Sequence, residues 1–66
     1  MKRCYKVIVK LKAKSGTVPD TTMTFETLAD TPLEAEQAVM ARHHKDWEAH
    51  YLFDGVQAVY PCEEAG

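Results

Sequence analysis

Residues 4–14, CYKVIVKLKAK, alternate between apolar and polar side chains with a period of two. Successive side chains of a β-strand point to opposite faces, so this period predicts a strand with one buried face and one solvated face. The predicted inward side chains are Tyr5, Val7, Val9, Leu11 and Ala13, and the outward ones are Lys6, Ile8, Lys10, Lys12 and Lys14. Such a strand is typical of an antiparallel sheet that is covered on one side only.

A second strand is predicted at residues 21–29, TTMTFETLA, which are rich in β-branched side chains. The preceding segment, SGTVPD at 15–20, has the composition of a connecting loop, so the two strands should form a hairpin. The predicted inward residues are Met23, Phe25 and Thr27, and the outward ones are Thr22, Thr24 and Glu26.

A helix is predicted from about residue 31 to residue 45. Thr31 and Glu34 have the spacing of a capping box, in which the threonine oxygen accepts from a first-turn N–H and the glutamate reaches back to the cap N–H. Pro32 falls at the first helical position, where its missing N–H costs nothing. The side chains expected to face the sheet are Ala35, Ala38, Val39, the stem of Arg42 and His43, with Met40 at the flank.

Residues 46–53 admit two interpretations. WEAHYLF alternates as a strand does, and the following DG would then turn the chain into a further strand at 56–62, VQAVYPC. Alternatively the helix runs one turn further and a loop leads to a single last strand. We favour the second interpretation, because no Gly or Asn marks a helix end near His44.

These elements predict one small α+β domain over residues 1–66, with the order β-β-α-β or β-β-α-β-β and one helix on one face of an antiparallel sheet. A right-handed crossover places the last strand beside the first. Cys4 and Cys62 would then be neighbours, and in an intracellular chain we expect them to be free thiols rather than a disulfide.

The composition, 45% apolar and 27% charged, is that of a soluble globular protein. No apolar run approaches the roughly 20 residues that span a bilayer, and the start MKRCYKVIVK lacks the apolar block of a signal peptide. We therefore expect a cytoplasmic protein without a membrane partner. A net charge of −2 argues against a protein that wraps nucleic acid, although five lysines lie within residues 2–14.

Three histidines crowd into RHHKDWEAHY at 42–51 and raise the question of a metal site. On a continued helix His43, Asp46 and His50 would share a face, but i and i+7 are about 10.5 Å apart along the axis. We therefore predict no metal and no cofactor. His44 with Glu48 and Asp46 with His50 fit surface imidazole–carboxylate pairs better.

No Gly-rich phosphate loop and no pocket-forming catalytic set is recognisable, so we expect a protein that is not an enzyme. The remaining candidates are a lysine stripe on the open sheet face and aromatic residues at its rim. The residues predicted to contact a partner are Lys6, Lys10 and Lys12, and Trp47, Tyr51 and Phe53. A nucleic-acid partner is less favoured, because readers of RNA on a sheet face also need stacking aromatics there. Crowding of aromatics should leave an apolar patch for dimerisation or for a partner.

The arrangement of YKVIVKLKAK, TTMTFETLADTPLEAEQAVMARH and GVQAVYP resembles small phage- and prophage-encoded accessory proteins, including some of anti-CRISPR or anti-defence type. In these a hairpin is followed by a segment like DTPLEAEQAV and a short closing strand. The resemblance implies a stoichiometric inhibitor or modulator of a host protein or complex, with neither catalysis nor a cofactor. It assigns no functional residue by position.

Overall fold

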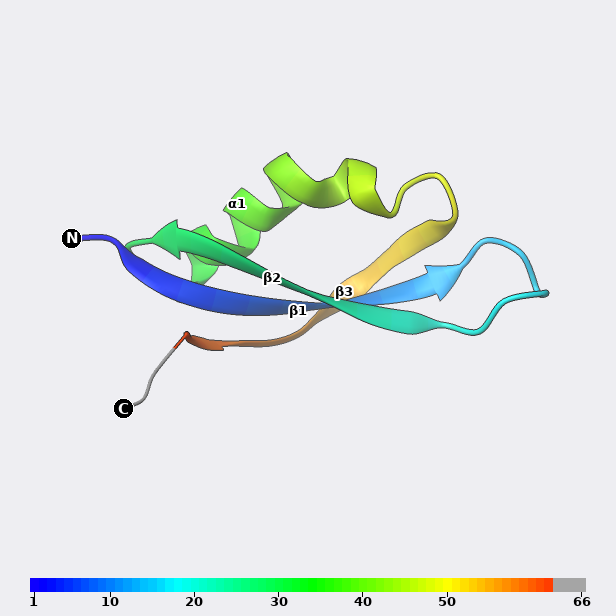
Figure 1. Ribbon diagram of the computed structural model, residues 1–66, viewed down its shortest axis with the longest axis horizontal. Helices are drawn as coiled ribbons and strands as arrows, with labels where there is room; N and C mark the ends of the chain where they lie inside the picture. Colours follow the sequence, from blue (N-terminus) through cyan, green and yellow to red (C-terminus); the bar gives the residue numbers. More distant parts are fainter. Residues whose placement is uncertain (63–66) are drawn as a thin grey trace.

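The computed structural model describes residues 1–62, which form a three-stranded antiparallel sheet with one helix packed on it (Figure 1). The strands are β1 (Arg3–Ala13), β2 (Thr21–Ala29) and β3 (Tyr51–Pro61), and helix α1 (Pro32–His43) is followed by a single 3-10 turn, His44–Asp46. The α+β class and the β-β-α-β order predicted from the sequence are confirmed. None of the helices within this part of the chain is long and apolar enough to cross a membrane.

The strand order is β2-β1-β3, so the first strand is central, as the predicted crossover requires. β1 and β2 pair without interruption from Arg3 opposite Ala29 to Leu11 opposite Thr21. The hairpin is therefore regular along its whole length, and every side chain of β2 keeps the face that its period-two pattern predicts.

The favoured interpretation of residues 46–62, a loop followed by a single last strand, is confirmed in its order, but the α-helix does not run further and β3 is longer than predicted. β3 begins at Tyr51, five residues before the predicted last strand, and it runs through Asp54 and Gly55 without turning. The pairing with β1 shifts register between Ile8 and Val9 and again between Val9 and Leu11. Gly55 has φ 103°, a backbone conformation that glycine adopts without a side-chain clash. The DG pair therefore makes a β-bulge inside one strand, and the four-stranded alternative is wrong.

The core lies between the sheet and α1. It contains four of the five predicted inward side chains of β1, all except the half-buried Ala13, together with one residue of β2, two helix residues and one aromatic residue from the loop. Its buried apolar members are Tyr5, Val7, Val9, Leu11, Ala29, Ala35, Val39 and Trp47. The predicted inward residues Met23 and Phe25 pack against this cluster from β2. Arg42, whose stem was expected to lie on the sheet, is exposed instead.

The start of α1 follows the predicted cap with one difference. Thr31 Oγ1 accepts a hydrogen bond from the N–H of Glu34 at 3.2 Å, as in a capping box. Glu34 Oε1 accepts from the N–H of Asp30 at 3.3 Å, one residue before the expected donor. At the other end the helix stops at His43, two residues earlier than predicted, and the 3-10 turn leads to the loop that carries Trp47.

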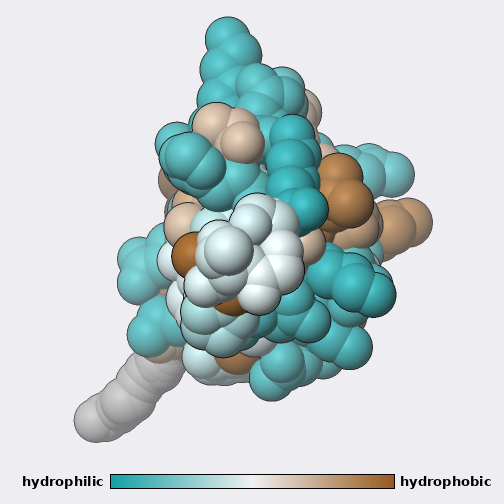
Figure 2. All heavy atoms as spheres, turned by 90° about the vertical axis from the view of Figure 1, so that its right-hand side faces the viewer, coloured by the Kyte–Doolittle hydropathy of each residue, from teal (hydrophilic) through white to brown (hydrophobic). Residues whose placement is uncertain are grey.

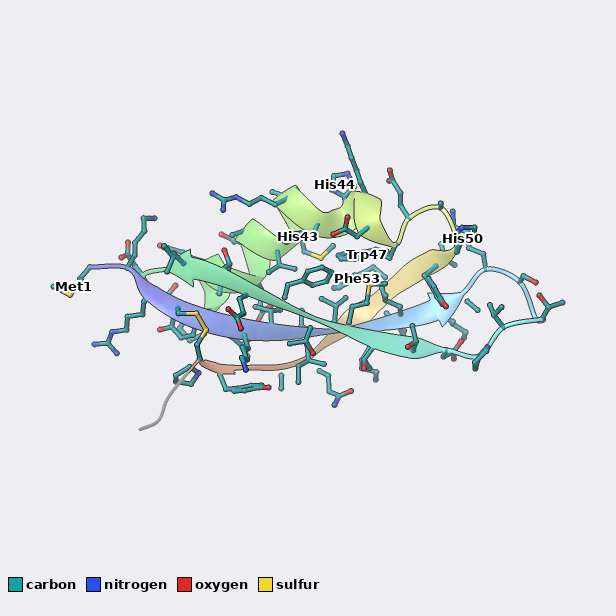
Figure 3. The ribbon with its side chains drawn as sticks, in the orientation of Figure 1. Met1, His43, His44, Trp47, His50 and Phe53 are labelled. Carbon is teal, nitrogen blue, oxygen red and sulfur yellow. A yellow bond between two sulfur atoms is a disulfide. The ribbon has the colours of Figure 1, made fainter. Side chains whose placement is uncertain are left out.

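A disulfide joins Cys4 of β1 to Cys62, the residue directly after β3, with the two Cα atoms 5.4 Å apart (Figure 3). The N–H of Cys62 also donates to the carbonyl of Cys4 at 3.1 Å. The predicted proximity of the two residues is confirmed, whereas the expectation of free thiols is wrong. The bridge spans 58 positions of sequence and so joins nearly the two ends of the described chain.

Thr27 is buried on the helix side of β2, and its Oγ1 has no hydrogen-bond partner among residues 1–62. A buried hydroxyl without a partner loses its hydration and gains nothing in return. We expect Thr27→Val, which keeps the shape, to raise the free energy of unfolding by about 1 kcal/mol. Urea denaturation would measure the gain. The matched control is Thr24→Val on the exposed face of the same strand, which should change stability by less than about 0.5 kcal/mol; a loss of stability in Thr27→Val would contradict the interpretation.

Candidate interaction face

Helix α1 covers one side of the sheet, and no other element of residues 1–62 covers the opposite side (Figure 1). We call this uncovered side the open face. It carries alternate side chains of all three strands, as their registers place them. The residues of the open face used below are Cys4, Lys6, Ile8, Lys10 and Lys12 of β1, Thr22, Thr24, Glu26 and Leu28 of β2, and Leu52, Asp54, Ala58 and Tyr60 of β3.

The three predicted lysines all lie on the open face, in different surroundings. Lys6 is half-buried between its register partners Glu26 and Tyr60. Lys10 is exposed opposite Thr22, and Lys12 is exposed opposite Leu52. The three lysine side chains therefore form a row along the central strand. The first lies beside an acidic residue, the second beside a polar one and the third beside an apolar one.

A shallow, open depression of about 580 Å³ lies around Lys10, near the bulge in β3. Two carboxylates, those of Asp20 and Asp54, line it together with Thr22. The open face thus alternates positive and negative groups around this lysine and is not a uniformly basic surface.

Three large apolar side chains are exposed on the open face. Leu28 is 61% exposed, Leu52 is 54% exposed and Tyr60 is 42% exposed. Ile8 and Ala58, a register pair near the middle of the face, are half-buried. Figure 2, which looks at the molecule from the hairpin-loop end, shows mostly hydrophilic side chains at this end, with hydrophobic ones in separate groups. On the open face itself, Leu28, Leu52 and Tyr60 lie among charged and polar side chains of the same strands.

The aromatic residues predicted for the rim belong to the other side of the sheet. Tyr51 pairs with Ala13 and Phe53 with Leu11, which places both on the side of the helix. Trp47 is only 3% exposed, because its ring lies between those of Phe25 and Phe53, at centroid distances of 5.6 and 6.4 Å (Figure 3). Trp47 is thus a core residue without surface to offer a partner, and its predicted place at an accessible rim is wrong. Tyr51 is half-buried and Phe53 is 44% exposed.

The histidines have separate local roles. His43 Nδ1 lies 3.2 Å from Asp46 Oδ2, and the imidazole stacks on Phe25 at 4.5 Å. His44 Nδ1 contacts the carbonyl of Met40 at 3.0 Å. His50 lies at the far end of the loop, one residue before β3, away from both (Figure 3). The chain leaves the helix before Asp46, so the helical spacing that would have aligned His43 with His50 does not exist.

The surface pairs expected from i, i+4 spacing also depend on a continued helix. Within residues 1–62 neither His44 with Glu48 nor Asp46 with His50 forms an ion pair. Glu48 instead donates its backbone N–H to the carbonyl of His44 at 3.0 Å, which closes the turn after the helix.

The sequence interpretation missed one cluster of metal-ligating types. Cys4, Glu26 and Cys62 bring one ligand atom each to within 4.8 Å of one another, at the end of the open face that carries the disulfide. The predicted strand order already placed the two cysteines together. Adding the hairpin register, in which Glu26 faces Lys6 next to Cys4, would have placed the carboxylate as well.

Together these features define a small sheet-and-helix protein with one uncovered, chemically mixed sheet face. No family model, no curated protein and no solved structure matches the chain. The resemblance to phage-encoded accessory proteins consequently stays a prediction.

Proposed function

We propose that this chain is a non-enzymatic interaction module that binds a partner protein stoichiometrically through the open face. The observation that carries the proposal is the exposure of Leu28, Leu52 and Tyr60 on a sheet face that nothing in residues 1–62 covers. Exposed apolar side chains with polar neighbours are the usual composition of a surface that binds another protein. A module of this kind acts by occupying its partner's surface, as an inhibitor or modulator does.

The mixed charge of the open face favours a protein over a nucleic acid. A surface that binds phosphates gains affinity by neutralising several of them with lysine or arginine. Here the row of lysines is interrupted by Glu26 beside Lys6 and by Asp54 beside Lys10. A surface with alternating charges instead binds a protein surface that carries the complementary pattern. It disfavours other proteins, because like charges would then face each other.

Charge reversal on the open face tests the proposal. We expect Lys10→Glu combined with Lys12→Glu to weaken partner binding by about tenfold or more, because two favourable charges become repulsive. Both side chains are exposed, so the melting temperature should change little. The measurement is affinity capture from a lysate of the native cell, treated with nuclease, followed by titration of the captured protein against the variants.

The matched control is Lys45→Glu, an equal change of charge at an exposed residue of the 3-10 turn on the helix side. It should bind the captured protein as the unmodified chain does. Equal binding by the open-face variant would refute the assignment of this face. Loss of the captured material on nuclease treatment would show that the ligand is a nucleic acid instead.

A further inference from the structure

The cluster of Cys4, Glu26 and Cys62 combines two sulfur atoms and a carboxylate at one end of the open face. Cys4 belongs to the central strand β1, Glu26 belongs to β2, and Cys62 is the residue that directly follows β3. The hairpin register places Cys4 opposite Leu28, two residues from Glu26 on the same face, and the N–H of Cys62 donates to the carbonyl of Cys4 at 3.1 Å.

We propose that these three residues form a zinc site when the disulfide is reduced, so that the disulfide and a bound Zn²⁺ are alternative links between β1 and β3. This inference is independent of the partner proposed for the open face. Thiolate sulfur and carboxylate oxygen are both ordinary zinc ligands, and three protein ligands with one water complete a tetrahedral site.

The distances fit this geometry. With Zn–S bonds of about 2.3 Å, two sulfur ligands of a tetrahedral site lie about 3.8 Å apart. The three potential ligand atoms already lie within 4.8 Å of one another, so opening the disulfide requires only a small separation of the sulfurs. The Cα atoms, 5.4 Å apart, need not move to another register.

Glu26 is available as a ligand. Its side chain is exposed, and it forms neither an ion pair nor a hydrogen bond with another residue of the described chain, although Lys6 is its register partner. The two cysteines are half-buried, so the site is partly shielded at the sulfurs and open to water at the carboxylate. A zinc ion can therefore enter from solvent without movement of the helix.

The exchange balances chemically. A cellular dithiol delivers two electrons and two protons to the Cys4–Cys62 bond, which breaks to two thiols while the dithiol becomes a disulfide. Zn²⁺ then displaces the two thiol protons, and a carboxylate oxygen of Glu26 supplies the third bond. The oxidised protein has no thiolate and cannot hold the ion, so metal binding reports the redox state of the surroundings.

Cobalt(II) is a suitable probe, because thiolate ligation gives a charge-transfer absorption that zinc lacks. The protein is reduced with a phosphine under anaerobic conditions, freed of reductant by gel filtration and titrated with Co²⁺. We expect one ion per chain with a thiolate-to-cobalt band for the reduced protein, and none for the disulfide form. Glu26→Gln should weaken binding by at least about tenfold. Glu48→Gln, an exposed glutamate outside the cluster, should bind as the unmodified chain does.

Circular dichroism on the same samples separates ligation from folding. A reduced chain that is unfolded without metal and regains its spectrum with Zn²⁺, whereas Cys62→Ser does not, supports the site because metal binding then drives folding. The proposal is overturned if the reduced protein shows no thiolate–cobalt band, if Glu26→Gln binds equally well, or if the disulfide form binds the ion too.

Discussion

Replacement of Cys4 by serine is expected to lower the free energy of unfolding by about 4 kcal/mol in the absence of metal. The bridge from Cys4 to Cys62 closes a loop of 58 positions, and the loss of chain entropy that it imposes on the unfolded state grows with loop length. A single core in a chain of this size supplies only roughly 3–5 kcal/mol. The variant should therefore be largely unfolded at 37 °C.

Urea denaturation, followed by the emission of Trp47, measures this effect, because the chain has one tryptophan and it is buried. Reduction of the unmodified protein with a chelator present should produce the same loss, and the double variant Cys4→Ser with Cys62→Ser should be insensitive to reductant. If the single variant, the reduced unmodified protein and the double variant each lose less than about 1 kcal/mol of unfolding free energy, the core alone holds the sheet together and the disulfide contributes little to stability.

Trp47→Ala should be nearly as damaging, with an expected loss of about 3–5 kcal/mol. The indole packs between Phe25 and Phe53 and closes the core where the helix has already ended, so its removal leaves a cavity that α1 cannot fill. Thermal melting followed by far-UV circular dichroism measures the loss. Trp47→Phe keeps most of the ring contact and should retain a cooperative transition.

Phe53→Ala is the matched control for the loss of an aromatic ring that is less buried, because the ring of Phe53 is 44% exposed and borders the same cluster. It should cost clearly less than Trp47→Ala. If both changes lower the melting temperature equally, the deeper burial of Trp47 does not make it more important for stability than Phe53. If Trp47→Ala leaves the fold intact but abolishes partner binding, then the residue belongs to the interaction surface after all.

Residues 3–43 could be predicted well because local and periodic signals agree there. The alternation of β1, the capping threonine and Pro32 each act within a few residues, and each has the expected partner or face in the structure. The end of the helix was harder to place. No Gly marks it, and the chain leaves the helix because Trp47 is drawn into the core, which is a tertiary effect invisible to local pattern.

The residues of the candidate site were also predictable only in part. The open-face lysines followed from period two, whereas Tyr51 and Phe53 were assigned to a rim without knowledge of their register with β1. Gly55 illustrates the cause: a DG pair suits both a hairpin turn and a bulge, and only pairing with a neighbouring strand decides between them. Whether the two cysteines form a disulfide could not be predicted, because this depends on the redox state of the protein's surroundings, which the residue types do not specify.

The two edges of the sheet differ in a way that limits assembly. β2 presents an unbulged backbone of nine residues, whereas β3 is interrupted at Gly55 and ends in Pro61, which has no N–H to donate. Only the first edge is a regular template for an incoming strand. Self-association along β2 would join two copies and then present only irregular edges outward, so it would stop at a closed dimer and would not propagate into fibres.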